Sequence, residues 1–270
     1  VRLVAAAGSA VALAAWGALS GVVIGACAWM AGVVAEAIVI RFLAEGTVRE
    51  RYGPGVPDED QPPTYGEVVR YHLPLAATSV MALLAMPVLQ AGIARMPRPE
   101  ENLAAWPVVF AIALFFRSPG FAFPEVVIAL LDRAGRAGVL RTFAFLLAGA
   151  TVVGLALFAV SPLLGLYLER VVDVPRRLVP YVVPGLLAAM IIPALQALQS
   201  WWRGVLMATR RTQHVYWGMG VALTTTAVAT VVAVHLQAPG VVSAALALAV
   251  GMVLEAAFLA RRARAAVAAL

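Results

Sequence analysis

Lysine is absent from this 270-residue sequence, and cysteine occurs once, at Cys27. A single cysteine cannot form a disulfide bond within the chain, and it cannot supply a cysteine-based metal site. Charged residues are also scarce, since they make up 13% of the chain, whereas soluble domains carry about 25%. This composition excludes an ordinary soluble globular domain.

Hydrophobic residues make up 63% of the chain. Several apolar stretches exceed the roughly 18–20 residues that cross a bilayer as a helix, and they lack the alternation of barrel strands. We therefore predict an all-α polytopic membrane protein with about eight transmembrane helices. The expected spans are residues 3–18, 20–43, 70–95, 103–131, 138–168, 178–207, 212–236 and 239–260.

All twenty basic residues are arginines, and they stand at the ends of apolar segments. A nucleic-acid surface would gather them in one patch, whereas a membrane protein concentrates them in its cytoplasmic loops. If the Arg49–Glu67 segment is cytoplasmic, fourteen arginines lie inside, five lie outside, and Arg117 falls within a span. This bias predicts a multi-pass protein of the plasma (inner) membrane with a cytoplasmic C-terminus.

Two features predict the domain organisation. The Gly-, Pro- and acid-rich segment 49–67 is typical of a solvated linker between an N-terminal part (1–48) and a C-terminal part (68–270). A pattern of two glycines and a glutamate (Gly21, Gly32, Glu36) also recurs 219 residues later as Gly240, Gly251 and Glu255. The repeat predicts two related lobes, and the start at Val1 suggests a fragment that lacks the beginning of the first lobe.

Arg117 is the most informative single residue, because a charge in mid-span costs about 2.5–3.5 kcal/mol and is usually functional. Pro119 and Gly120 follow it and predict a helix kink. Glu125 is about 12 Å farther along the helix and on a different face, so an intrahelical pair is not expected. Two interpretations remain: a structural kink whose arginine pairs with another helix, or an anion contact in a cavity.

A second polar group lies on one face of the span around residue 200. Gln196, Gln199 and Arg203 are spaced at i, i+3 and i+7, and Pro193 predicts another kink nearby. Such a stripe either joins helices or lines a water-filled path. Gln90 is a further candidate for the same path. The neighbouring pair Trp201–Trp202 is expected to anchor the helix at the membrane interface.

The repeated carboxylates have a structural and a functional interpretation. Glu36 and Glu255 could pair with Arg41 and Arg261 near the interface, or serve in ion coupling. No spacing of His, Asp and Glu predicts a metal site, and no P-loop, nucleophile elbow or dinucleotide fingerprint occurs. We therefore expect neither an enzyme nor a bound cofactor or nucleic acid. The expected partners are membrane lipids, a small solute and the missing helices.

Four motifs follow one another along the chain: Pro87-x-x-Gln90 with Arg95, Arg117-x-Pro119 with Glu125, the segment 204–212, and Gly240/Gly251/Glu255. In this order they resemble motifs of the two-lobed multidrug/oligosaccharidyl-lipid/polysaccharide exporters and flippases (MATE-like fold), and of the progressive ankylosis transporters in particular. The similarity spans helices five to twelve of that twelve-helix family. Position 117 is Arg where the family has His, position 199 is Gln where it has a basic residue, and position 90 is Gln where it has Asn.

The resemblance implies export of small polyanions by alternating access between two lobes. In that case Arg117 would contact the anion, and Glu125 would be either a proton or sodium coupling carboxylate or a structural partner of an arginine. Two other hypotheses stay open: a flippase for a lipid-linked polysaccharide or cell-wall precursor, and a non-transporting scaffold subunit. As a fragment, the chain is expected to transport nothing by itself.

Overall fold

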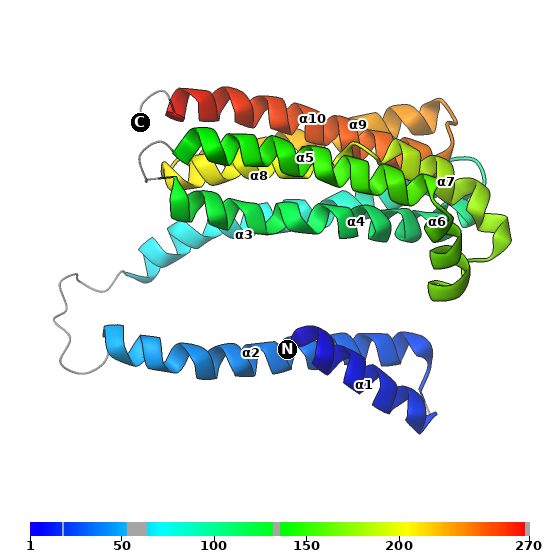
Figure 1. Ribbon diagram of the computed structural model, residues 1–270, viewed down its shortest axis with the longest axis horizontal. Coiled ribbons are helices and arrows are strands. Elements are labelled where there is room, and N and C mark those ends of the chain that lie inside the picture. The colour runs from blue at the N-terminus through cyan, green and yellow to red at the C-terminus, as the bar shows by residue number, and fades with distance from the viewer. Residues whose placement is uncertain (18, 53–63, 132–135, 268–270) are drawn as a thin grey trace. The chain divides into compact units, whose positions relative to one another are not determined.

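The structure is a computed structural model that describes residues 1–270 except 18, 53–63, 132–135 and 268–270 (Figure 1). The chain divides into two compact units, residues 1–64 and 65–270. The first unit contains α1 (Arg2–Trp16) and α2 (Gly21–Tyr52). Helix α2 continues past the predicted linker start at residue 49, and the middle of that linker lies outside the described residues.

The second unit is a bundle that runs from α3 to α10. Its long helices are α3 (Tyr65–Ile93), α4 (Pro99–Leu130), α5 (Arg136–Val160), α9 (Gln213–His235) and α10 (Gly240–Val267). Its shorter elements are α6 (Pro162–Leu166), the π-helical turn η1 (Tyr167–Val171), the 3₁₀ turn η2 (Arg176–Leu178), α7 (Val179–Ala188) and α8 (Ile192–Ala208). No strand occurs among the described residues.

Within the described residues, seven helices are long and apolar enough to cross a membrane, and α7 and α8 together form one of them. The expected span 3–18 corresponds to α1, an apolar helix of 15 residues, whereas a bilayer core requires roughly 20. The predicted span 138–168 ends early. Ser161 caps a new helix by accepting a hydrogen bond from the Leu163 N–H (3.3 Å), and Pro162 occupies its first turn.

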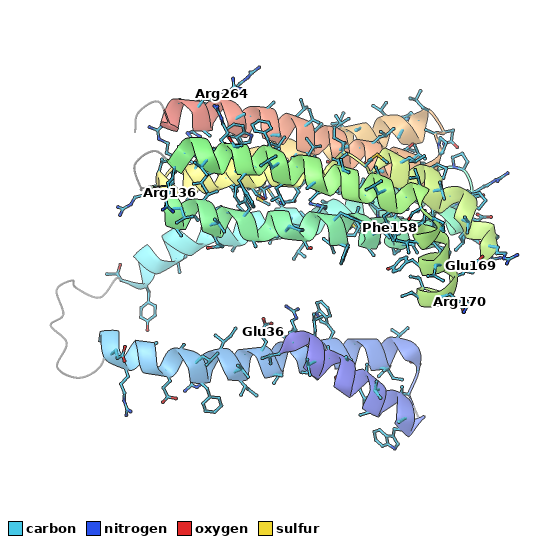
Figure 2. All side chains as sticks on the ribbon, viewed as in Figure 1. Glu36, Arg136, Phe158, Glu169, Arg170 and Arg264 are labelled. Atoms are coloured by element: carbon cyan, nitrogen blue, oxygen red, sulfur yellow. The ribbon has the colours of Figure 1, made fainter. Side chains whose placement is uncertain are left out.

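Helix α8 lies inside the second unit, where it packs against α4, α5 and α10, while α9 packs against α3 and α10 (Figure 1). Two apolar clusters hold these helices together. One contains Trp106, Leu155 and Leu186, and the other contains Phe123, Trp201 and Leu259. Charged side chains gather at the two ends of the unit. Arg136 and Arg264 lie at one end and Glu169 and Arg170 at the other (Figure 2), which agrees with the predicted separation of these arginines onto two sides.

The hairpin α1–α2 of the first unit shares backbone geometry with the hairpin α9–α10 of the second unit. Each first helix is followed by a residue with positive φ, Gly17 (70°) and Gln237 (49°). In each case the N–H of that residue bonds to the carbonyl three positions earlier, Ala14 and Val234, at 3.1 Å. These residues are 220 positions apart, one more than the displacement of the sequence repeat, so the two turns share a backbone geometry at a register shifted by one residue.

The second repeated glycine permits a close contact between the two helices in both hairpins. A Cβ on Gly32 would lie 2.9 Å from the backbone oxygen of Arg2 in α1. A Cβ on Gly251 would lie 2.7 Å from the backbone oxygen of Ala222 in α9 and 2.2 Å from the Thr226 hydroxyl. Only glycine therefore permits each helix pair to approach this closely.

A buried asparagine joins the starts of α4 and α10. The Asn102 side-chain amide donates to the carbonyls of Pro97 (3.0 Å) and Arg98 (2.9 Å). Its oxygen accepts from the Val241 N–H (2.9 Å), one of the N–H groups that a helix start leaves without an internal partner.

We expect Asn102→Ala to lower the free energy of unfolding by about 1–2 kcal/mol, because it leaves the buried Val241 N–H without its hydrogen-bond partner. The measurement is reversible unfolding in mixed micelles. Glu100→Ala, an exposed change in the same helical turn, is the control and should stay within about 0.5 kcal/mol. Equal stability of the two variants would contradict this role for Asn102.

Candidate functional site: a polar pocket within the second unit

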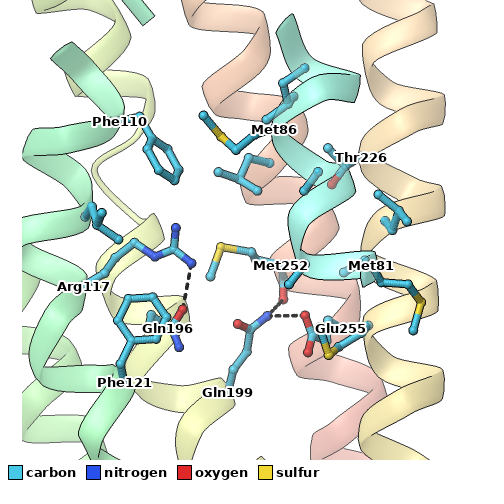
Figure 3. Close-up of a pocket in the computed structure, with 18 of the residues that line it drawn as sticks. Met81, Met86, Phe110, Arg117, Phe121, Gln196, Gln199, Thr226, Met252 and Glu255 are labelled. Atoms are coloured by element: carbon cyan, nitrogen blue, oxygen red, sulfur yellow. Dashed lines mark hydrogen bonds between the residues drawn. The ribbon is translucent and has the colours of Figure 1, made fainter. Parts of the chain in front are cut away.

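Five helices of the second unit surround a pocket of about 270 Å³ (Figure 3). Each helix contributes residues spaced three or four apart, so each presents one face to the pocket. The lining residues are Met81, Ala82, Ala85, Met86 and Leu89 of α3; Phe110, Leu114, Arg117 and Phe121 of α4; Gln196, Gln199 and Arg203 of α8; Met219, Ala222, Leu223 and Thr226 of α9; and Leu248, Met252 and Glu255 of α10.

Arg117 reaches from α4 into this pocket (Figure 3). One terminal nitrogen donates to the Gln196 side-chain oxygen at 2.8 Å. The guanidinium carbon also lies 5.4 Å from the centre of the Phe121 ring, a cation–π distance. The Nε–H is buried and has no hydrogen-bond partner among the described residues. The described part of the chain therefore satisfies Arg117 with one neutral amide and one aromatic face.

The meeting of Arg117 and Gln196 depends on a close approach of α4 and α8. A Cβ on Gly120 would lie 2.9 Å from the Gln196 Cγ and 3.3 Å from the Ala197 backbone nitrogen. The absence of a side chain at Gly120 thus allows the two helices to touch one turn from Arg117. Pro193 contributes by starting α8, because it occupies the first turn, where no backbone N–H is required.

A second polar group lies on the opposite side of the pocket and links α8 to α10. Arg203 donates hydrogen bonds from its Nε and from one terminal nitrogen to the same oxygen of Glu255, and the distance from Nε to that oxygen is 3.1 Å. The Gln199 amide donates to the other Glu255 oxygen and to the Met252 carbonyl, both at 3.0 Å. Glu255 is almost completely buried. The hydrogen bonds from Arg203 and Gln199 offset the free-energy cost of burying its carboxylate.

The charges of the pocket do not cancel. Arg203 and Glu255 neutralise each other, whereas Arg117 has no carboxylate partner among the described residues. The lining therefore carries one net positive charge, located on α4. A positive charge that is held by few protein groups in an apolar site attracts an anion.

The structure brings together five of the predicted site residues, and three others do not line the pocket with them. Arg117, Gln196, Gln199, Arg203 and Glu255 line the one pocket. The remaining three, Gln90, Glu125 and Glu36, are not among its lining residues: Gln90 and Glu125 are exposed in the second unit, and Glu36 belongs to the first.

The expected partners of the two repeated glutamates need correction. Glu255 pairs with Arg203 rather than with Arg261, and Glu36 lies 3.5 Å from Arg2 rather than pairing with Arg41. In both cases the partner is on another helix. For Glu36 the close contact of Gly32 with α1 brings Arg2 near, whereas Glu255 meets Arg203 because α8 packs against α10. Helix α4 is continuous through Pro119 and Gly120, and the kink expected there stays a prediction. The kink expected at Pro193 coincides with a break between α7 and α8 at residues 189–191.

Sequence reasoning missed the apolar wall of the pocket. Met81, Met86, Met219 and Met252 are half of the eight methionines in the chain. Their concentration on three helices is a signal, but apolar side chains on lipid-facing and pocket-facing surfaces have the same chemistry. The sequence alone therefore could not assign them to a site.

No group of three or more His, Cys, Asp or Glu side chains that could hold a metal ion occurs in the described part of the chain. Comparison with protein-family models, curated proteins and solved structures found no match to this chain.

Proposed function

We propose that this chain is part of a multi-pass membrane transporter that exports small anionic solutes, and that the anion binds at Arg117 in the pocket of the second unit. The single observation that carries the proposal is the lone positive charge of that pocket. Arg117 is held by Gln196 and Phe121 and has no acidic partner in the described residues. Keeping an uncompensated charge within a membrane span costs about 2.5–3.5 kcal/mol, and binding an anion would offset that cost.

The seven apolar helices support the membrane part of the proposal. The bundle would belong to a MATE-like, two-lobed transporter that works by alternating access, located in the plasma (inner) membrane with its C-terminus in the cytoplasm. The shared geometry of the α1–α2 and α9–α10 hairpins supports two lobes of common design. In this proposal the role of Glu255 is structural, because both of its oxygens are already engaged by Arg203 and Gln199.

The test is anion release from cells that produce the complete protein encoded by the gene for this chain. Cells are loaded with a mixture of labelled carboxylates, and the released compounds are measured for the wild type and for Arg117→Ala. Loss of a charge-assisted hydrogen bond is worth about 1.5–3 kcal/mol, so the variant should release the substrate roughly ten- to hundred-fold more slowly.

Arg170→Ala is the matched control, since Arg170 is exposed in η1 and does not line the pocket. It removes the same charge and should leave release unchanged. Membrane abundance of all three proteins is measured by immunoblot, so that a loss of protein is not mistaken for a loss of transport. Equal release from the wild type and Arg117→Ala at equal abundance would refute the role of Arg117.

A further inference from the structure

The pocket is predominantly apolar. Thirteen of its nineteen lining side chains are hydrophobic, and the other six are Arg117, Gln196, Gln199, Arg203, Thr226 and Glu255. Ligand pockets typically combine an apolar wall with a few polar groups that fix orientation. The ligand of such a pocket must therefore have an apolar body as well as its polar group.

The amide and carboxylate groups of the lining lie on one side of Arg117 together with Phe121, and apolar side chains lie on the other side together with Thr226 (Figure 3). Figure 3 shows Phe110 and Met86 on one side of the Arg117 guanidinium, and Gln196, Gln199 and Glu255 on the other. A ligand whose charged end contacts Arg117 can thus place an apolar body against Phe110 and Met86. A ligand that is polar all over would have to bury polar groups against these side chains, at a cost for every group left without a hydrogen bond.

The charge of the pocket limits the charge of the ligand. Arg117 supplies one positive charge, and the Arg203–Glu255 pair supplies none in sum. A single carboxylate or sulfonate is neutralised by Arg117, and a guanidinium can bind either through two parallel hydrogen bonds. A ligand with three or four negative charges would leave several of them without a partner in an apolar site, which is strongly unfavourable.

Methionines at the wall indicate that the shape of the apolar body is not tightly specified. Met81, Met86, Met219 and Met252 come from three helices. An unbranched thioether side chain adapts to different shapes, and surfaces rich in methionine accept varied partners. The cavity of about 270 Å³ is close to the smallest typical ligand pockets, at about 300 Å³, which suits an aromatic ring with a short carboxylate chain.

From these observations we infer that the ligand class is an amphipathic organic monoanion, in which one carboxylate or sulfonate contacts Arg117 and an aryl or alkyl body contacts the methionine wall. This inference rests on the proposed function and narrows it, because it excludes small polyanions such as citrate or pyrophosphate as substrates of this pocket.

The experiment is calorimetric binding to the purified complete protein in lipid nanodiscs, with empty nanodiscs subtracted. The probes are 4-phenylbutanoate, its neutral amide 4-phenylbutanamide, its cationic counterpart 4-phenylbutylamine, citrate and pyrophosphate. We expect the carboxylate to bind at least tenfold more tightly than the amide. The amine, citrate and pyrophosphate should neither bind measurably nor displace it.

Two variants separate the charged contact from the apolar one. Arg117→Gln should abolish the preference for carboxylate over amide while amide binding persists. Met86→Ala should weaken both ligands severalfold and leave their ratio unchanged. Arg170→Gln is the control and should bind like the wild type. The probe series on the wild-type protein remains informative even if a variant does not fold.

The outcomes distinguish this inference from the proposed function. Binding of citrate or pyrophosphate that requires Arg117, with no binding of 4-phenylbutanoate, would overturn the monoanion inference and leave an anion transporter. Tighter binding of the amine, equal affinities for carboxylate and amide, or no Arg117-dependent anion binding would overturn both.

Discussion

Arg203→Met is expected to lower the free energy of unfolding by about 3–5 kcal/mol, the cost of removing one partner of a buried ion pair. Glu255 has 3% of its side chain exposed, so without Arg203 its carboxylate would stay buried with only the Gln199 amide as a donor. Methionine is similar in length and replaces the packing of the Arg203 stem, which leaves the loss of charge as the main change. The measurement is reversible unfolding in mixed micelles.

The double variant Arg203→Met/Glu255→Leu distinguishes this explanation from a simple loss of contacts. Replacing both partners of a buried ion pair by apolar side chains is often neutral or stabilising. The double variant should therefore recover at least half of the stability lost by Arg203→Met. A double variant that is less stable than Arg203→Met would show that the destabilisation does not come from an unpaired carboxylate.

Gly251→Ala is expected to destabilise the second unit by about 2–3 kcal/mol, the upper part of the range for overpacked interiors. The added methyl group would meet the Ala222 backbone oxygen at 2.7 Å and the Thr226 hydroxyl at 2.2 Å. A backbone oxygen cannot rotate away, so α9 and α10 must separate along their contact. Thermal unfolding of the purified protein measures the effect.

Gly149→Ala is the matched control for this change, because Gly149 lies within α5 and has no atom of another element within 4 Å of an added Cβ. Alanine favours a helix interior over glycine by about 0.5–1 kcal/mol, so this variant should be as stable as the wild type or slightly more stable. A similar loss of stability in both variants would contradict the close contact at Gly251.

The positions of the helices were largely predictable from the sequence, because each span is a predominantly apolar run with Gly, Pro or Arg near its ends. The predicted span 178–207 has its counterpart in residues 176–208, and the predicted span 212–236 in α9. The exception is the predicted span 138–168, which ends before Ser161-Pro162. Serine followed by proline is typical of a helix start, but the sequence is apolar on both sides of this pair, so one continuous helix was predicted.

The contacts between helices were less predictable. The polar face of Gln196, Gln199 and Arg203 follows from helix periodicity, and all three line the pocket. The partner of Arg203 lies 52 residues away on α10, a distance at which hydropathy and spacing give no information. The expectation that Trp201 anchors the helix at the membrane interface was wrong. Its side chain is 2% exposed and packs inside an apolar cluster, since a tryptophan beside an interfacial arginine can face either lipid or another helix.

The single positive charge of the pocket has a consequence for the energetics of the transport cycle proposed above. Arg117 is part of the protein, so it returns after each cycle, whereas the monoanion bound to it leaves. Each cycle would then move one negative charge across the membrane. With the cytoplasm negative by 100 mV, outward movement of that charge is favoured by about 2.3 kcal/mol, equivalent to roughly a fifty-fold concentration ratio. The membrane potential alone would thus drive export against a substantial gradient, without a coupled proton or sodium ion.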